Sequence, residues 1–117
     1  MYVCMFMCMR AVFAPFVDTT SMRTKRRRHS TERELALIDR LVSMSNGYFH
    51  NSGIAYEKNS YSADGTLFDY MAGVMNVTYS LCVEMWGGAA VADCFVQFNP
   101  ASEQLSKDLQ ILERFLV

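Results

Sequence analysis

The sequence lacks the cysteine spacing of a metal-binding or disulfide-rich domain. Its four cysteines, Cys4, Cys8, Cys82 and Cys94, include no CxxC pair, and no cluster of His or Cys follows Cys4 and Cys8 at metal-site spacing. We therefore expect free, reduced and buried thiols. A disulfide between Cys82 and Cys94 stays open, but the sequence gives it no support.

The sequence also has no excess of charge, no internal repeat and no low-complexity linker. The formal net charge is −1, which gives no global reason to expect nucleic acid as a partner. Positive charge is scarce after residue 40, where only Lys58, Lys107 and Arg114 remain. The 117 residues fit one small domain, residues 1–117, and the 51% hydrophobic content indicates that the chain folds.

Residues 1–17 are strongly apolar, and three interpretations compete for them. A signal peptide needs a basic start, but the only charge in this segment is the central Arg10. A transmembrane helix needs about 20 apolar residues without such a charge. We favour a buried strand near Val12–Val17, bounded by Pro15 and Asp18, and expect no membrane partner.

A compact basic cluster occupies residues 23–28. A localisation signal, a phosphate-binding patch or a kinase site at Ser30 would suit such a run. A solvated loop that leads into a helix is the simpler interpretation, and no aromatic residue interleaves the charges to stack on bases. An interaction module that uses this basic loop is the alternative function for the chain.

Helices and strands alternate along the sequence. Thr31 and Glu34 form a capping-box pattern that begins a helix, which ends at Asn46-Gly47. The alternation predicts an α/β fold in which helices cover a largely buried sheet. The further expected elements are strands at 53–57 and 77–85, a short helix at 66–75, and a final helix begun by Asn99-Pro100, with Leu105, Leu109, Leu112 and Leu116 on one face.

The expected strand at 77–85 has two different faces. Large apolar residues alternate along it with Thr78, Ser80, Cys82 and Glu84. This pattern predicts a core on the first face and a cleft on the second, with one carboxylate at its C-terminal end. By spacing alone, a structural Glu84 that reaches solvent or pairs with a lysine is the simpler interpretation.

The tripeptide Asn76-Val77-Thr78 has the form of an N-glycosylation sequon. It abuts the expected buried strand, so we expect it to be unused. The sequence does not indicate where in the cell the chain resides.

The ordered residues of the second half resemble the C-terminal part of zinc metallocarboxypeptidases, the carboxypeptidase A/B-like family. The specific part covers 61–100, and FAPFVDTT, at 13–20, more weakly resembles the strand and proline turn after the family's second zinc histidine. The resemblance implies a partial α/β/α sandwich built from the C-terminal strands and helices of a mixed sheet. It is carried by Tyr61, Gly65, Asp69, Tyr79-Ser80, Glu84, Asp93-Cys94-Phe95 and Phe98-Asn99-Pro100.

The resemblance also implies roles in the hydrolysis of C-terminal peptide bonds of peptides or proteins. Glu84 matches the general base that acts on the zinc-bound water. Tyr61 matches the mobile tyrosine that closes over the substrate and binds its C-terminal carboxylate. Phe68 stands where the family faces the bottom of the specificity pocket, which implies apolar substrate side chains. Between Asp69 and Glu84 the spacing is one residue longer than in some members, and Asp69 and Cys82 are expected to shape the cleft rather than to do chemistry.

The zinc site of the family has no counterpart in this sequence. The family needs His-x-x-Glu and a distant second His, whereas this chain has only His29 and His50. The string HSTE at 29–32 directly opens a helix, and we interpret it as coincidence. We therefore expect a truncated catalytic domain that is inactive alone and whose zinc ligands lie elsewhere. Sheet edges and an apolar face left uncovered should make it poorly soluble or oligomeric.

Overall fold

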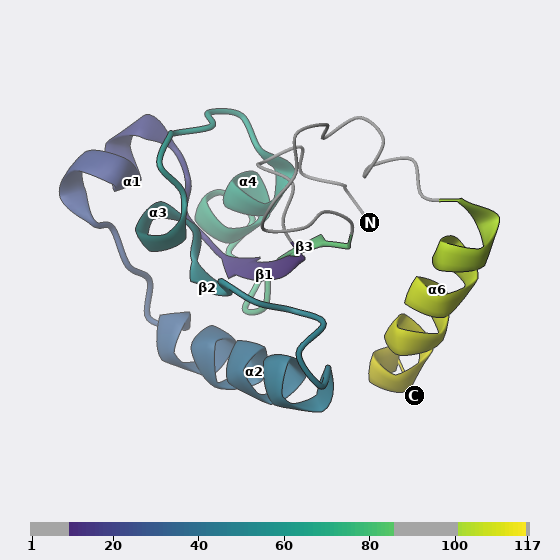
Figure 1. Cartoon of the computed structure of the whole chain (residues 1–117). Coiled ribbons are helices and arrows are strands. Elements are labelled where there is room, and N and C mark those ends of the chain that lie inside the picture. Colours follow the sequence, from purple (N-terminus) through teal and green to yellow (C-terminus); the bar gives the residue numbers. More distant parts are fainter. Residues whose placement is uncertain (1–9, 86–100, 117) are drawn as a thin grey trace.

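The computed structural model describes residues 10–85 and 101–116, and they form a mixed α/β structure with a three-stranded sheet (Figure 1). The predicted α/β class is confirmed. Among the described residues, no helix is both long enough and apolar enough to span a bilayer. In chain order, the elements are β1 (Ala11–Ala14), α1 (Thr19–Thr24), α2 (Thr31–Met44), β2 (Gly53–Ile54), α3 (Ala55–Lys58), α4 (Leu67–Gly73), β3 (Cys82–Glu84) and α6 (Ser102–Leu116).

The sheet is built around β1, with strand order β2-β1-β3. β1 runs parallel to β2 and antiparallel to β3. The register pairs Phe13 with Gly53 on one side and Ala11 with Glu84 on the other. All four residues of β1 are buried, as the sequence predicts, although the strand ends at Ala14 and does not reach Val17.

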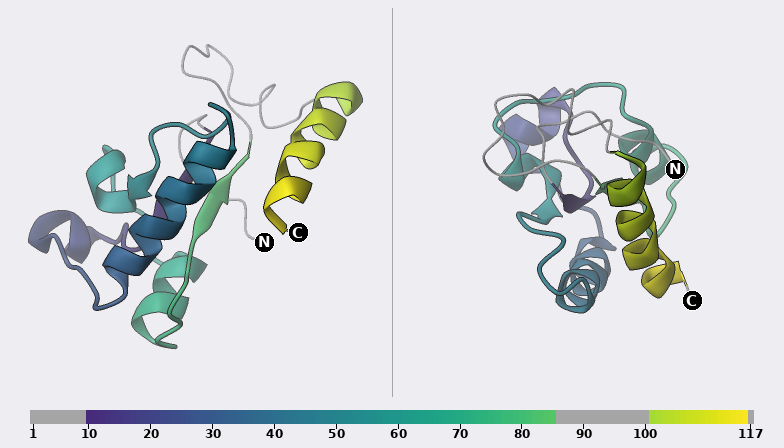
Figure 2. Two further views of the ribbon diagram at one scale, coloured as in Figure 1. Left: turned by 90° about the horizontal axis from the view of Figure 1, so that it is seen from below. Right: turned by 45° about the vertical axis from the view of Figure 1, so that its right-hand side comes forward.

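Helices cover both faces of the sheet, and β1 alternates between them. Ala11 and Phe13 belong to a core cluster on the side of α3 and α4, together with Val17, Ala55, Phe68 and Cys82. Val12 and Ala14 belong to a second cluster on the side of α2, together with Ile38, Tyr48 and Phe49. Figures 1 and 2 show α2 on one side of the strands and α4 on the other.

The final helix and the second strand differ from their predicted forms. β2 covers only Gly53–Ile54, because the chain turns into α3 where the strand was expected to continue to residue 57. On α6, Leu109 is exposed, whereas Asp108 is fully buried and Ile111 packs against the α2-side cluster. The predicted leucine stripe is therefore wrong at Leu109, whereas Leu105 is half-buried and the side chains of Leu112 and Leu116 lie outside what the structure describes. The expected Asn99-Pro100 start lies outside the described residues.

The predicted strand at 77–85 is shorter than expected, and both of its faces are covered. Leu81 and Val83 pack against the α2-side cluster, as the predicted core face requires. Only Cys82–Glu84 pair with β1, because β1 itself is four residues long. The residues expected to line a cleft, Ser80, Cys82 and Glu84, are buried, whereas Tyr79 is half exposed. The physical reason is the close packing of α4, where the Ser80 hydroxyl donates a 2.7 Å hydrogen bond to the Phe68 carbonyl.

Helix α2 begins and ends near the predicted residues, but its first turn works differently. Its end is as expected, because Asn46 and Gly47 both adopt positive φ, at 50° and 84°. The capping box is wrong: Ser30 occupies the cap position, and its side chain makes no capping hydrogen bond. Glu34 is fully buried, and its Oε1 accepts a 3.2 Å hydrogen bond from the Ser80 amide.

Arg28 joins the basic run to this buried carboxylate. Its side chain is only 7% exposed, and its Nε lies 3.8 Å from Oε2 of Glu34, an ion pair longer than a hydrogen bond. Its Nη2 donates to the carbonyls of Val77 and Thr78. The expectation of a solvated basic loop is therefore wrong for Arg28, which ties the start of α2 to the chain before β3.

Glu34→Ala should lower the free energy of unfolding by about 3 kcal/mol, because Arg28 and the Ser80 amide lose a buried partner. Glu32→Ala is the matched control in the same helix. Glu32 is 81% exposed and lies 3.4 Å from Arg27, so its loss should cost less than about 0.5 kcal/mol. Urea unfolding curves measure both changes. Equal losses in the two variants would contradict the buried tie.

Candidate functional site

Glu84 is the last residue of β3, and its side chain is fully buried. Because side chains alternate along a strand, Glu84 lies on the same face as Cys82, which belongs to the core on the side of α3 and α4. The expectation that this face is an open cleft is therefore wrong for β3. Across the sheet, Glu84 faces Ala11, the first residue of β1.

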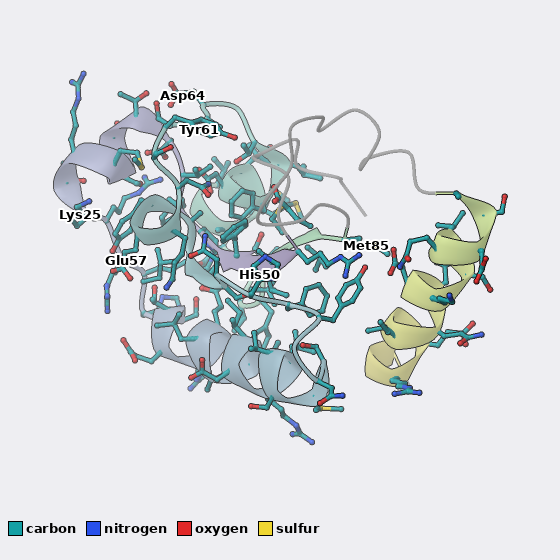
Figure 3. All side chains as sticks on the ribbon, viewed as in Figure 1. Lys25, His50, Glu57, Tyr61, Asp64 and Met85 are labelled. Atoms are coloured by element: carbon teal, nitrogen blue, oxygen red, sulfur yellow. The ribbon has the colours of Figure 1, made fainter. Side chains whose placement is uncertain are left out.

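Tyr61 and Phe68 lie on the same side of the sheet as Glu84. Phe68 is buried in α4 as a member of that core, and the half-buried Tyr61 packs against the same core from the loop after α3. Figure 3 shows Tyr61 close to Asp64, with Met85, the neighbour of Glu84, far from both in the view. The structure thus places the three predicted site residues on one side of the sheet.

Asp69 links α4 to the chain that follows β1. Its Oδ2 accepts hydrogen bonds from the amides of Val17 at 2.9 Å and Asp18 at 3.0 Å. Burial raises the pKa of the Asp69 carboxyl from 3.8 to about 6, and the charge of Asp18 adds to this, while the two amides and Arg26 oppose it. Asp69 fixes the position of α4 and so of Phe68.

A cluster of polar side chains, the sheet-end cluster, lies where the chain leaves β3. It consists of Arg10, Tyr48 and Asp108. The Tyr48 hydroxyl donates to the carbonyl of Met85, next to Glu84, and the Arg10 guanidinium lies 4.6 Å from the centre of the Tyr48 ring. Burial and the adjacent Asp108 raise the pKa of Tyr48, so the phenol keeps its proton at neutral pH. This sheet-end cluster connects α6 to the end of the sheet that carries Glu84.

Sequence reasoning missed the burial of Glu34 and Asp108, which are two of the three buried acids on the described helices; the third is Asp69. Each of the two missed acids has a signal in its spacing. Glu34 stands four residues before Ile38 on the apolar stripe of α2, and Asp108 stands three residues after the half-buried Leu105 and three before Ile111 on α6. An acid on the apolar face of a helix predicts a buried polar contact.

The described residues do not provide a zinc site. In residues 10–85 and 101–116, no three His, Cys, Asp or Glu side chains gather into a group that could hold a metal ion. His29 is exposed, and Glu32, the other end of the HSTE string, lies against Arg27. His50 is half-buried, and its amide donates a 2.8 Å hydrogen bond to the Arg10 carbonyl. Cys82 is buried, as predicted, and the other cysteines lie outside the described residues.

The raised pKa of Asp69 predicts how stability depends on pH. The folded state holds this proton more tightly than the unfolded state, so the contribution of Asp69 to stability is complete below pH 3.8. It is lost as the pH rises through about 6. Between pH 4 and 7, the free-energy difference between Asp69→Asn and the original chain should therefore shift by about 2 to 3 kcal/mol in favour of the variant, at about 1.4 kcal/mol per pKa unit.

Urea unfolding at pH 4, 5, 6 and 7 measures this shift. Asp64→Asn is the control of opposite sign, because hydrogen bonds from Thr19 lower the pKa of the Asp64 carboxyl. The stabilisation from Asp64 is present at neutral pH and is lost as the pH falls. Parallel pH profiles for the original chain and Asp69→Asn would show that Asp69 does not titrate as described.

Comparison with known proteins adds no support for a relationship to the metallocarboxypeptidases, so the resemblance rests on the residues of this sequence alone. The chain matches no protein-family model, no curated protein and no solved structure.

Proposed function

We propose that the chain is the C-terminal part of a metallocarboxypeptidase-like catalytic domain that hydrolyses the C-terminal peptide bond of peptides or proteins. Its sheet and covering helices would form part of the α/β/α sandwich of that family. The ordered residues of 61–100 supply the resemblance, and the mixed sheet with helices on both faces is compatible with it.

The pairing of Glu84 with Ala11 is the observation that supports this proposal most strongly. In the resemblance, β1 is the strand that follows the second zinc histidine of the family. The antiparallel register sets the carboxylate at the end of β3 beside the beginning of β1. Glu84 therefore stands at the end of the sheet from which the metal-binding part of such a domain would approach.

The surroundings of Glu84 suit a general base. Such a group can take a proton from an attacking water and return it to the leaving amine. The hydrogen bond from Tyr48 to the Met85 carbonyl fixes the chain directly after Glu84, which helps to hold the carboxylate in one place.

Tyr61 and Phe68 would contribute to substrate binding. The loop that carries Tyr61 is anchored on both sides of the tyrosine, because Tyr56 donates its amide to Phe16 and Ala63 donates its amide to Val17. A half-buried phenol on such a loop can reach a substrate carboxylate by a change in side-chain rotamer. The buried Phe68 suits a preference for apolar C-terminal side chains.

The zinc ion of the family would be held by residues that this sequence does not contain. His29 and His50 are the only histidines, and neither stands in a group of metal-binding side chains in the described structure. The proposal therefore assigns proton transfer and substrate contacts to this chain and assigns it no metal ligand.

The alternative, an interaction module that uses the basic loop, has less support. Arg26 pairs with Asp18 at 2.7 Å and Arg27 with Glu57 at 2.9 Å. Arg28 is buried against Glu34. Most of the positive charge of this loop is thus balanced within the chain, which leaves little of it to attract an acidic partner.

Replacing Glu84 by glutamine should strongly reduce catalysis. The test uses the longest protein that is naturally translated from the reading frame containing this chain. In that protein, Glu84→Gln should lower kcat for release of an apolar C-terminal residue by about 10² to 10⁴-fold. Glu57→Gln, an exposed carboxylate on α3, is the matched control and should keep full activity. Unchanged kcat in Glu84→Gln, at unchanged zinc content, would refute the assignment.

The isolated chain offers an independent check by metal analysis. Inductively coupled plasma mass spectrometry should find no stoichiometric zinc after incubation with the metal and removal of the excess. Bound zinc at one equivalent, with peptidase activity, would show that the ligands are in this chain after all.

Tyr61→Phe should weaken substrate binding without a comparable loss of kcat. Removal of one hydrogen bond to a carboxylate costs about 1.5 kcal/mol, so KM should rise about tenfold. Tyr79→Phe is the control, because Tyr79 is half exposed and lies after α4 rather than on the same loop. Steady-state kinetics with a peptide and with its C-terminal amide separate loss of the carboxylate contact from other effects of the substitution. The amide has no C-terminal carboxylate, so its KM should be the same for Tyr61→Phe and for the original enzyme.

A further inference from the structure

The sequon Asn76-Val77-Thr78 lies on the surface, in the segment that joins α4 to β3. The expectation that it abuts a buried strand is wrong, because β3 begins only at Cys82. Asn76 and Thr78 are both exposed. Figure 2 shows this segment at the lower edge of its left view, beyond the end of α4.

Hydrogen bonds to α4 and Arg28 fix the backbone of the sequon, while the side chains of Asn76 and Thr78 are exposed. The amide of Val77 donates a 2.9 Å hydrogen bond to the carbonyl of Met71, which closes the last turn of α4. The carbonyls of Val77 and Thr78 accept from the buried guanidinium of Arg28. Asn76 adopts a φ of 53°, a conformation that asparagine tolerates at the end of a helix.

Exposed apolar side chains flank the sequon. Val74 is 68% exposed, Met75 56% and Tyr79 51%. From Thr66 to Val83, the sequence contains one charged residue, Asp69, and it is buried. Soluble proteins rarely leave large apolar patches in contact with water, and here no exposed charge on this stretch offsets the apolar surface.

We propose that Asn76 is an acceptor for an N-linked oligosaccharide, and that the sugar covers the apolar residues on either side of it. The donor is a lipid-pyrophosphate-linked oligosaccharide. The amide nitrogen of Asn76 forms a bond to C1 of the first sugar and gives up one proton, while the bond from C1 to the pyrophosphate oxygen breaks and the lipid pyrophosphate leaves. Thr78 supplies the hydroxyl that the sequon requires.

The proposal is independent of the peptidase assignment, because it rests on Asn76, Thr78 and the residues that flank them. Asn76 also has a structural use as the positive-φ residue after α4, and the variants must separate the two roles. Asn76→Gly keeps the helix end, because glycine adopts positive φ without strain, but removes the acceptor. Thr78→Ala keeps Asn76 and removes the hydroxyl, whereas Thr78→Ser retains it.

The test is expression of the full chain behind a secretion leader in eukaryotic cells. The secreted chain should be heavier than its sequence, and an amidase that cleaves N-glycans should return it to the bare mass with aspartate at position 76. Asn76→Gly and Thr78→Ala should appear only at the bare mass, and Thr78→Ser should remain modified. Cell-free translation with microsomes gives the same reading for any variant that is not secreted.

Light scattering tests the second half of the proposal. The glycosylated chain should be less associated than Asn76→Gly, and removal of the sugar should raise the association of the original chain to that of the variant. A bare Asn76 in the microsomal product would overturn the acceptor assignment. Equal association with and without the sugar would overturn the covering role.

Discussion

The burial of β1 on both faces is the constraint on which the rest of this structure depends. Its four residues supply apolar side chains alternately to the two core clusters, so α2 and α4 are positioned by the same short strand. Its two edges set the register of β2 and β3. Since Glu84 takes its place from the pairing with Ala11, any change that tilts β1 also displaces the carboxylate on which the proposed chemistry depends.

Buried carboxylates hold the helices against this strand. Glu34 connects α2 to Ser80, Asp69 connects α4 to the chain after β1, and Asp108 lies with Tyr48 where α6 approaches the sheet. Each acid stands on a helix and reaches a group far away in the sequence. Polar contacts of this kind are directional, so they specify one arrangement of the helices where apolar packing alone permits several.

Local signals predicted β1, α2, α4 and β3 but not α1 or α3, and long-range contacts decided the lengths of the strands. The end of α2 at Asn46 was predictable, because a positive φ is a property of a few residues. The covering of the second face of β3 was not predictable, because alternation identifies two faces but does not tell whether a helix such as α4 packs on the polar one. Likewise, the sequence around Glu34 is compatible both with a capping box and with a buried hydrogen bond. Only the position of the Ser80 amide in the fold decides for the buried hydrogen bond. The predicted site residues Glu84, Tyr61 and Phe68 share a side of the sheet, but their positions along it depend on loop paths that no local pattern encodes.

The attachment of α6 has a consequence for how this protein opens. Its described contacts with the core are the packing of Ile111 and the buried position of Asp108 beside Tyr48. These lie on the side of the α2 cluster, so separation of α6 would leave the strand pairing of β1 intact. A partial opening that keeps the sheet paired costs less free energy than global unfolding. Amide hydrogens of α6 should therefore exchange with solvent through a partial opening, well before those of β1, which exchange only when both layers of helices have separated from the sheet.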